Sequence, residues 1–217
     1  MIPPERPLLL LATANQGKLR ELRAILAGVP VELLGLDDVP LGAPPEVEET
    51  GESFLDNACI KARAYAAWSG LAAVADDSGL EVDALGGEPG VRSARYAGPG
   101  SSDQANLDKL LRELAGVPPA RRGARFRCCA VLVDPGVQRK WHAEATWEGR
   151  IIEAPRGSNG FGYDPVFLPE GWHRTSAEVD AASKDAASHR GRAFRALRPA
   201  IQAWATERAT GGGAPGK

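Results

Sequence analysis

The segment from Leu8 to Leu26 constrains the fold of this chain more than any other part of its sequence. A continuous apolar run, Leu8 to Ala12, is followed at once by the polar loop Thr13-Ala-Asn-Gln-Gly-Lys18. Apolar residues then recur at helical spacing through Leu26, so the segment predicts a strand, a loop and a helix. Backbone amides at a helix N-terminus and one lysine suit a phosphate, although Asn-Gln-Gly is also an ordinary turn.

Strands and helices continue to alternate after this segment. Val31 to Leu36 is a second short strand candidate, and Ser53 can cap a helix that runs to about Ser69. Leu71 to Ala75 predicts a buried strand that ends at Asp76-Asp77-Ser78-Gly79. This alternation predicts an α/β fold with a parallel or mixed sheet.

The second half of the chain predicts antiparallel strands and a long last helix. Asp103 is expected to cap a helix, and two strands should flank the turn Asp134-Pro-Gly136. A final helix is predicted from about Ser188 to Trp204. No long linker interrupts the sequence, so we expect one domain over residues 1–208 and a disordered tail over 209–217.

The charge balance excludes some classes of function. Among 217 residues there are 26 Lys and Arg and 28 Asp and Glu, which gives a net charge of −2. Such a chain has no overall attraction to nucleic acid or to an anionic membrane, so a phosphate site must be a local cluster of cations. Three cysteines without a CxxC pair argue against a disulfide framework or a zinc site, and the apolar runs are too short to span a membrane. We therefore expect a cytoplasmic protein.

Two groups of carboxylates are candidates for a metal site. Glu48 and Glu49 precede the helix that Ser53 caps, and Asp76 and Asp77 follow an apolar strand. Carboxylates beside a core are costly unless they are paired or bound to a cation, and a site with few carboxylates suits Mg²⁺. An extended backbone would point Asp76 and Asp77 to opposite faces, so that one could meet a metal. The alternative for this pair is a capped turn, Asp-Asp-Ser-Gly.

Cations and aromatic rings form a further group of candidates. Lys61 lies in the second predicted helix, and Lys184, His189 and Arg190 lie around the start of the last one. In Gly160-Phe-Gly-Tyr-Asp-Pro165, glycines would let the backbone approach a ligand and aromatic rings could stack on a base. Solvated lysines, a helix start and a glycine-rich turn are the structural alternatives.

Several well-known nucleotide and hydrolase signatures are absent from the sequence. Gly17-Lys18 is followed by Leu19 and has Ala12 at the upstream position, so this loop is not a GxxxxGK[ST] P-loop. There is also no GxGxxG after a strand, no HExxH and no GxSxG. The chemistry must therefore be inferred from the candidate groups and their order.

Eight motifs follow one another over roughly residues 8 to 205. They are Thr13-Ala-Asn-Gln-Gly-Lys-Leu-Arg-Glu21, Glu48-Glu-Thr-Gly-Glu-Ser-Phe54, Asn57-Ala-Cys-Ile-Lys-Ala62, Ala75-Asp-Asp-Ser-Gly-Leu80, Leu85-Gly-Gly-Glu-Pro-Gly90, Ser93-Ala-Arg-Tyr96, Gly160-Phe-Gly-Tyr-Asp-Pro165 and Ser188-His-Arg-Gly191. Together they resemble one family, the noncanonical purine nucleoside-triphosphate pyrophosphatases, also called inosine triphosphate pyrophosphatases. Eight motifs in order are far more specific than any one of them. Ala14 departs from the glycine that the family often has there, and the segment before Lys184 is diverged and short.

This resemblance implies an elongated α/β fold with a central mixed sheet flanked by helices, two lobes with a substrate cleft between them, and a homodimer. The implied phosphate contacts are Thr13, Ala14, Asn15, Gln16, Gly17, Lys18 and Lys61. The implied Mg²⁺ ligands are Asp77, which is also the implied proton acceptor, and Glu49, with Glu48 as the alternate to Glu49. The implied contacts to the rest of the substrate are Ser78, Phe161, Gly162, Tyr163, Asp164, Lys184, His189 and Arg190, of which the last two would read the base.

The implied reaction is hydrolysis of ITP, dITP and XTP to the monophosphate and pyrophosphate, which would cleanse the nucleotide pool. A free aspartate with a pKa of about 3.9 is a poor base at neutral pH, so Asp77 must gain from Asp76 or act mainly through the metal. An oxo group accepts hydrogen bonds where adenine offers a donor, so Arg190 and a suitable His189 tautomer would favour inosine and xanthosine. The alternatives are a Maf-like pyrophosphatase of modified pyrimidines and a non-catalytic nucleotide-binding module.

Overall fold

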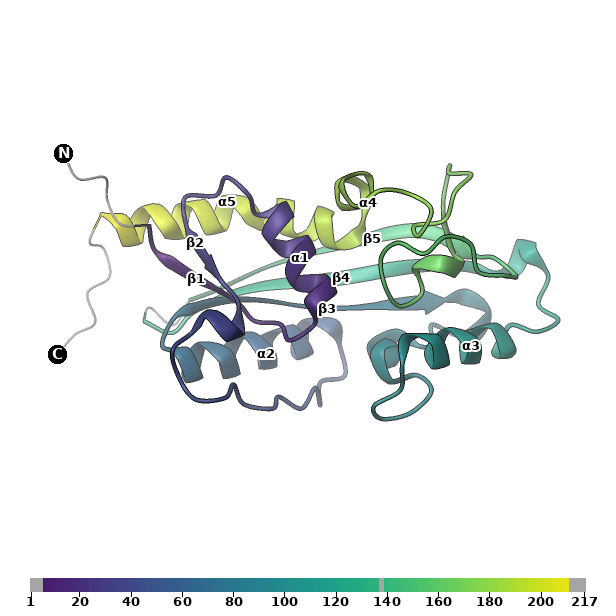
Figure 1. Ribbon diagram of the computed structural model, residues 1–217, viewed down its shortest axis with the longest axis horizontal. Helices are drawn as coiled ribbons and strands as arrows, with labels where there is room; N and C mark the ends of the chain where they lie inside the picture. The colour runs from purple at the N-terminus through teal and green to yellow at the C-terminus, as the bar shows by residue number, and fades with distance from the viewer. Residues whose placement is uncertain (1–5, 137–138, 211–217) are drawn as a thin grey trace. The chain divides into compact units, whose positions relative to one another are not determined.

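A computed structural model describes residues 6–136 and 139–210 of the chain (Figure 1). These residues divide into two compact units. Residues 6–77, 129–136, 139–144 and 193–210 belong to unit 1, and residues 78–128 and 145–192 belong to unit 2.

The strands form a mixed sheet in the order β2-β1-β3-β4-β5-β6. Their bounds are β1 (Leu8–Leu11), β2 (Glu32–Leu34), β3 (Ala72–Val82), β4 (Gly123–Asp134), β5 (Arg139–Ile151) and β6 (Phe167–Pro169). β1 pairs in parallel with β2 and with β3, so that Leu9 lies opposite Leu33 on one side and Ala72 on the other. β5 and β6 are antiparallel. The predicted α/β class with a mixed sheet is confirmed.

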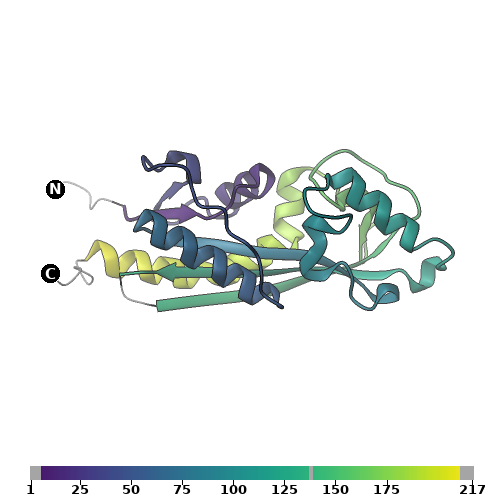
Figure 2. The ribbon, with the colours of Figure 1, turned by 90° about the horizontal axis from the view of Figure 1, so that it is seen from below.

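In unit 1, helices cover both faces of the strands. α2 (Phe54–Ser69) lies on one face and α5 (His189–Ala209) on the opposite face (Figures 1 and 2). α1 (Gln16–Ile25) and α2 begin where the sequence supplies a capping side chain, since Asn15 accepts a hydrogen bond from the amide of Lys18 and Ser53 accepts one from the amide of Asp56. α2 ends at Gly70, whose φ of +71° suits glycine. The predicted helix from Ser53 to Ser69 is confirmed.

Unit 2 has a core of its own beneath α3 (Asp103–Glu113). Residues of β3, α3, β4, β5 and β6 meet in this core, with Leu80, Leu110 and Phe167 fully buried. The ring of Phe167 contacts Phe126 at 4.6 Å and Trp147 at 5.4 Å between ring centroids. α4 (Ala181–Ala187) and short 3₁₀ turns complete unit 2. A helix of seven residues is too short to give a clear periodic signal, and α4 was not predicted.

The predicted end of the third strand is wrong. β3 does not stop at Ala75 but continues as extended backbone through Asp76-Asp77-Ser78-Gly79 to Val82. Asp76 and Asp77 are 2% and 5% exposed, so both carboxylates are taken into the interior within a strand. Because each has cationic or hydrogen-bonding partners there, the strand can continue, and the capped turn does not form.

Other boundaries also differ from the prediction. Ser102, not Asp103, caps α3, because the Ser102 side chain accepts the hydrogen bond from the Ala105 amide. α5 continues beyond Trp204 to Ala209, the first residue of the predicted tail, and residues 211–217 of that tail lie outside the described residues. The three cysteines are buried. Over the part of the chain that the structure describes, no helix is both long and apolar enough to cross a membrane.

Candidate active site

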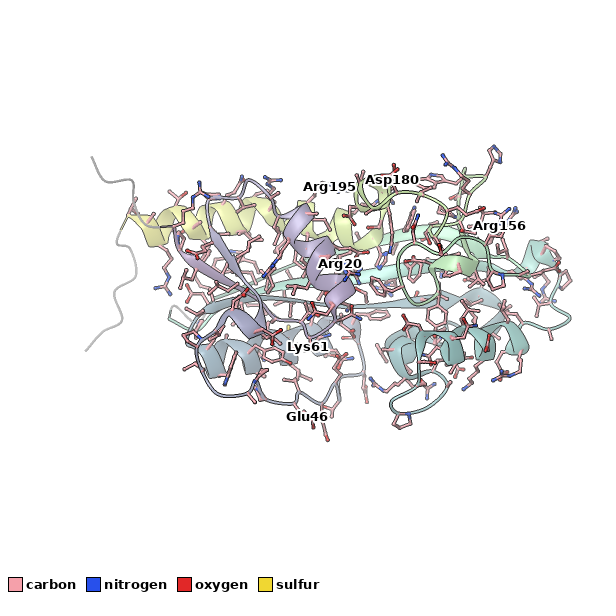
Figure 3. All side chains as sticks on the ribbon, viewed as in Figure 1. Arg20, Glu46, Lys61, Arg156, Asp180 and Arg195 are labelled. Carbon is pink, nitrogen blue, oxygen red and sulfur yellow. The ribbon has the colours of Figure 1, made fainter. Side chains whose placement is uncertain are left out.

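Charged and amide side chains gather in unit 1 around the start of α1, the start of α2 and the middle of β3. We call this group the charged cluster, and its members are Lys18, Glu49, Asn57, Lys61, Asp76 and Asp77. Asn57 and Lys61 are one turn apart on α2, so they project from the same side of that helix. Figure 3 labels Lys61 on α2.

Asp76 and Asp77 each face an ammonium group. They are consecutive in β3, so their side chains point to opposite faces of the strand. Lys18 Nζ lies 3.1 Å from Asp76 Oδ2, and Lys61 Nζ lies 3.6 Å from Asp77 Oδ1. These partners offset the cost of burying the carboxylates of two consecutive residues.

Lys61 also brings the segment before α2 into the charged cluster. Its Nζ lies 3.1 Å from Glu49 Oε1, so the carboxylates of Glu49 and Asp77 converge on one ammonium group. Asn57 contacts the other oxygen of Asp77, since Asn57 Nδ2 donates to Asp77 Oδ2 at 3.1 Å. Glu49 is half-buried whereas Glu48 is exposed, which favours Glu49 of the two predicted alternatives.

Burial and charge set the proton affinities of the charged cluster. Burial raises the pKa of the Asp77 carboxyl above its ordinary value, while the ammonium groups of Lys61 and Lys18 oppose that rise. Burial would lower the pKa of Lys61, but the carboxylates of Asp77, Glu49 and Asp76 outweigh it and hold the pKa of Lys61 above its usual range. Lys61 is therefore charged at neutral pH, and Asp77 is a better base than a free aspartate.

The predicted phosphate loop lies at the start of α1. Asn15 Oδ1 accepts from the Lys18 amide at 3.0 Å, and Thr13 Oγ1 accepts from the Asn15 amide at 3.2 Å. The remaining first-turn amides, those of Gln16 and Gly17, have no acceptor within the helix by geometry. Ala14 and Gln16 are exposed. The positive end of the helix dipole and the Lys18 ammonium group therefore lie at an accessible part of unit 1, where they could bind a phosphate.

The donor set of the charged cluster fits a magnesium ion. The carboxylates of Glu49 and Asp77 meet at a point that already holds a cation, the Lys61 ammonium group. Mg²⁺ typically takes one or two carboxylates and fills its other positions with water and phosphate oxygens. Within residues 6–136 and 139–210 no three or more His, Cys, Asp or Glu side chains are grouped to hold a metal, so Glu48 does not join Glu49 and Asp77.

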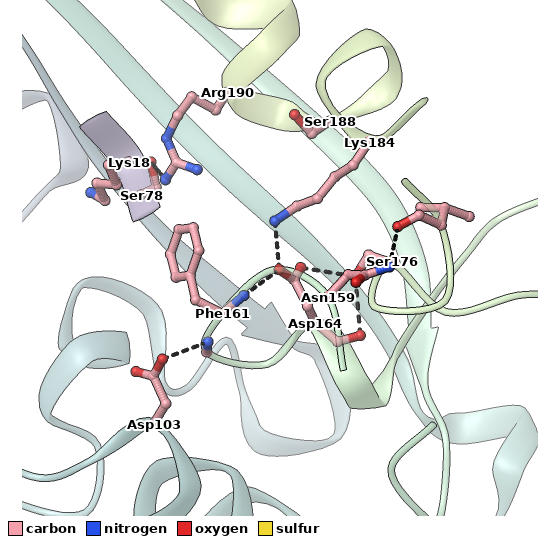
Figure 4. Close-up of polar contacts among 12 residues, drawn as sticks. Lys18, Ser78, Asp103, Asn159, Phe161, Asp164, Ser176, Lys184, Ser188 and Arg190 are labelled. Atoms are coloured by element: carbon pink, nitrogen blue, oxygen red, sulfur yellow. Dashed lines mark hydrogen bonds and ion pairs between the residues drawn. The ribbon is translucent and has the colours of Figure 1, made fainter. Parts of the chain in front are cut away.

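A second set of predicted residues comes together in unit 2. We call it the ring-and-cation group, and its members are Ser78, Phe161, Asp164, Lys184 and Arg190 (Figure 4). Around the ring of Phe161, Lys184 Nζ lies 4.9 Å and Arg190 Cζ lies 5.6 Å from the centroid. Arg190 Nη2 donates to Ser78 Oγ at 3.2 Å. An aromatic face beside two cations is suited to a planar, electron-rich ring.

Asp164 organises the loop that carries Phe161. Its carboxylate accepts hydrogen bonds from the Phe161 amide at 2.9 Å and from Ser176 Oγ at 2.9 Å, and it pairs with Lys184 Nζ (Figure 4). Asp164 is 2% exposed, and the amide of Gly162 donates to Asp103 Oδ2 at 2.8 Å. Asp164 therefore shapes this loop through its carboxylate.

Gly160 and Tyr163 complete the support of this loop. Gly160 has a φ of +76°, and a Cβ there would lie 2.0 Å from Asp164 Oδ2, so only glycine fits without displacement. The hydroxyl of Tyr163 donates to the carbonyl of Ser93 at 2.8 Å in the interior, which makes Tyr163 part of the support rather than an accessible ring.

His189 and Arg190 begin α5, after Ser188, whose Oγ accepts from the Gly191 amide at 3.1 Å. Both side chains are buried, at 4% and 2% exposure. The imidazole ring of His189 stacks on Phe126, with ring centroids 4.7 Å apart and planes 9° apart. Phe126 thus fixes the plane of the His189 imidazole.

Sequence reasoning missed several residues that hold these groups. Asn57 was seen only as part of a motif, and Phe126 and Ser176 not at all. The sequence did contain a signal for Asn57. This asparagine lies one helical turn before Lys61, so the two side chains project from the same side of the alanine-rich helix. Phe126 and Ser176 are distant in sequence from their partners, and no local pattern reveals them.

Comparisons with known proteins find similar proteins over nearly the whole length of the chain. The model of the Ham1 family matches residues 9–200. A dITP/XTP pyrophosphatase of Streptomyces coelicolor is 52% identical over 197 residues, covering 89% of this chain and 96% of that protein. A dITP/XTP pyrophosphatase of Methylococcus capsulatus is 54% identical over 198 residues, covering 90% and 96%. The solved structure of a HAM1 protein from Coxiella burnetii has a TM-score of 0.81 and 38% identity, and the match covers 91% of this chain and 99% of that one. This chain therefore belongs to the Ham1 family.

Proposed function

We propose that this chain hydrolyses noncanonical purine nucleoside triphosphates, namely ITP, dITP and XTP, to the monophosphate and pyrophosphate. The observation that carries this proposal is the position of Lys61 Nζ between the carboxylates of Glu49 and Asp77, with Lys18 on Asp76 nearby. Alternating cations and carboxylates suit a polyanion that arrives with a divalent cation. Relatives named dITP/XTP pyrophosphatases, 52% and 54% identical over most of their length, support the same activity.

The phosphate end of the reaction is assigned to the charged cluster. Asp77 accepts a proton from water while the water oxygen bonds to the α-phosphorus, and the bond to the bridging oxygen breaks so that pyrophosphate leaves with the electron pair. Its raised pKa makes this proton transfer more favourable than for a free aspartate. Lys18, Lys61 and the first-turn amides of α1 neutralise the triphosphate as charge moves onto the leaving group.

Mg²⁺ is the proposed cofactor of the charged cluster. Glu49 and Asp77 would hold it, and when bound it supplies positive charge to the phosphates. If Glu49 and Asp77 held the metal, the Lys61 ammonium group would be available to bind a phosphate oxygen of the substrate.

The base end is assigned to the ring-and-cation group together with His189, which precedes Arg190 at the start of α5. The ring of Phe161 offers a stacking face, and Arg190 and His189 present donors to an oxo group at the position where adenine carries an amine. Adenine would leave a buried donor unpaired, which is the costly outcome in such a site.

Arg190 gives the sharpest test of this selectivity. Arg190→Ala should narrow the ratio of kcat/KM for ITP over ATP by roughly 10- to 100-fold, because a hydrogen bond from a charged donor is worth about 1.5–3 kcal/mol. Arg195→Ala, an arginine later on the same helix, is the matched control and should leave the ratio unchanged. An unchanged ratio in Arg190→Ala would remove this residue from base recognition.

The function itself is tested by release of pyrophosphate from ITP, XTP, GTP and ATP, each with and without Mg²⁺. We expect magnesium-dependent release that is largely confined to ITP and XTP. The Maf-like alternative predicts turnover of modified pyrimidine triphosphates instead, and neither relative's name favours it. Binding of ITP without release of pyrophosphate from any triphosphate would support the non-catalytic module and contradict the proposal.

A homodimer in the cytoplasm completes the proposal. Three buried cysteine thiols fit a reducing compartment. Light scattering at several protein concentrations should give twice the mass of one chain, and a constant single-chain mass would contradict the dimer.

A further inference from the structure

Asn57 connects the two carboxylate-bearing segments of the charged cluster. Its Nδ2 donates to Asp77 Oδ2 at 3.1 Å, and its Oδ1 accepts from the backbone amide of Gly51 at 2.7 Å. Gly51 lies two residues after Glu49 in the segment that precedes α2. One amide group therefore bridges β3, which carries Asp77, and the segment that carries Glu49.

The contact with Gly51 depends on close approach. A Cβ at position 51 would lie 2.6 Å from Asp56 Cβ, 2.7 Å from Asn57 Oδ1 and 3.0 Å from the Asn57 amide nitrogen. Any side chain at this position would push the segment away from the start of α2. The glycine thus keeps the segment against Asn57, so that the hydrogen bond can form.

The helix itself gives no reason to place an asparagine here. Asparagine is a weak helix former, and Asn57 is 0% exposed among alanine residues of α2. Burying an amide is costly unless both its donor and its acceptor are used. Asn57 uses both, and each of its two bonds leads to a different segment of the charged cluster.

We infer that Asn57 is a positioning residue, which fixes the carboxylates of Glu49 and Asp77 relative to each other so that they can share one cation. This inference rests on the proposed function only in that Glu49 and Asp77 are the carboxylates assigned to Mg²⁺. Lys61, one turn further along α2, already lies between these carboxylates. Asn57 holds in place the two segments whose carboxylates contact that cation.

Asn106 offers a matched control from unit 2. It is also a helical, buried asparagine, 2% exposed, and it also ties its helix to neighbouring backbone. Its Oδ1 accepts from the Ala97 amide at 2.8 Å, and its Nδ2 donates to the carbonyl of Ala94 at 3.1 Å. Asn57→Leu and Asn106→Leu remove the same chemical group from comparable settings, and only the first touches the charged cluster.

The experiment measures binding of Mn²⁺ without nucleotide by electron paramagnetic resonance, together with kcat and KM for ITP at saturating Mg²⁺. Wild type, Asn57→Leu, Gly51→Ala and Asn106→Leu are compared, with the melting temperature of each as the measure of folding. We expect Asn57→Leu and Gly51→Ala to lose about 10- to 100-fold in Mn²⁺ affinity and in kcat, the range for partners that orient metal ligands. The KM for ITP should stay close to that of wild type, and Asn106→Leu should lose thermal stability alone.

Any other outcome contradicts either the positioning role of Asn57 or the proposed function. Equal losses of Mn²⁺ affinity in Asn57→Leu and Asn106→Leu, or wild-type affinity in Asn57→Leu, overturn the positioning role. If Asn57→Leu does not fold, Gly51→Ala tests the same bond from its other end, and wild-type affinity there overturns the inference. A wild-type chain that binds Mn²⁺ but cleaves no triphosphate ends the proposed function while the affinities still test Asn57. A wild-type chain that binds no Mn²⁺ overturns the inference itself.

Discussion

Asp77 combines burial with a cationic partner and a hydrogen-bonding partner. It is 5% exposed, which raises its pKa, and it also lies within reach of the ammonium group of Lys61 and the amide of Asn57. Burial favours the protonated form, and the polar partners keep the charged form accessible. A carboxylate balanced in this way can both take up a proton and release it during a catalytic cycle.

Removing the charge of Asp77 should therefore stop turnover with little change in shape. Asp77→Asn is expected to lower kcat for ITP by on the order of 10²- to 10⁴-fold, the usual contribution of a general base. Glu81→Gln makes the same chemical change on the same strand, at a residue paired with Arg127, and should keep the wild-type rate. Steady-state release of pyrophosphate measures both, and a near wild-type rate in Asp77→Asn would exclude it as the base.

At the scale of the elements, the loop that precedes β6 depends on Gly160. Gly160 and Gly171 both have a φ of +76°, but their surroundings differ. A Cβ on Gly160 would meet Asp164 Oδ2 at 2.0 Å and Lys184 Nζ at 3.1 Å, whereas nothing lies within 4 Å of a Cβ on Gly171. The two positions share the backbone strain and differ only in what a methyl group would displace.

Alanine substitutions at Gly160 and Gly171 separate the effect of backbone strain from the effect of displacing neighbouring side chains. Both variants should lose about 1–2 kcal/mol of stability, the cost of a left-handed conformation for alanine. Only Gly160→Ala should raise the KM for ITP, by roughly 10-fold or more, because a lost stack between a base and an aromatic ring costs about 1–3 kcal/mol. Steady-state kinetics of the two variants checks this. Equal KM values for ITP would show that the loop carrying Phe161 does not bind the base.

The end of β4 is joined to α5 by a single carboxylate. Asp134 is fully buried and accepts hydrogen bonds from Trp204 Nε1 at 2.6 Å, from Arg208 Nε at 2.9 Å and from the Gly136 amide at 2.8 Å. Burial would raise the pKa of Asp134, but these hydrogen bonds outweigh it and hold the pKa below its usual range. The charged form of Asp134 therefore stabilises the folded state.

This depressed pKa predicts a specific pH dependence of stability. The stabilisation is fully present above the unfolded-state pKa of about 3.9 and is lost as the pH falls through the lower pKa of the folded state. Asp134→Asn should cost about 1.5–3 kcal/mol at neutral pH, as for other hydrogen bonds to a charged group, and less in acid. Urea unfolding at pH 7 and at about pH 3 measures both.

Glu207→Gln is the control for Asp134→Asn, since Glu207 is a carboxylate of the same helix in an exposed pair with Arg139. It should cost no more than about 1 kcal/mol at either pH. A cost for Asp134→Asn that does not decrease in acid would contradict the assigned cause.

The elements that the sequence predicts well are those with local signals. Ser53 caps α2 through its own hydroxyl, and the alternation in β5 is visible residue by residue. The course of β3 beyond Ala75 could not be predicted in this way. Two adjacent aspartates usually end a strand, and here they stay within it because Lys18 and Lys61, from other elements, meet them.

At the scale of the whole molecule, order along the chain predicts the family and the fold class, whereas contacts between distant residues decide the site. The predicted residues Asp164 and Lys184 come together, but the buried position of Asp164 makes it a support for the Phe161 loop. The stack of His189 on Phe126 and the bridge from Asn57 to Gly51 and Asp77 depend on packing that no sequence period encodes.

The measurement that tests the central claim most directly is hydrolysis of ITP by the wild-type chain in ¹⁸O-labelled water with Mg²⁺, followed by mass spectrometry of both products. Attack of water on the α-phosphorus predicts inosine monophosphate with one ¹⁸O atom and unlabelled pyrophosphate. Label in the pyrophosphate would mean attack on the β-phosphorus, and inosine diphosphate with inorganic phosphate would mean cleavage of a different bond. Either of these results would contradict the mechanism assigned to Asp77 and the charged cluster.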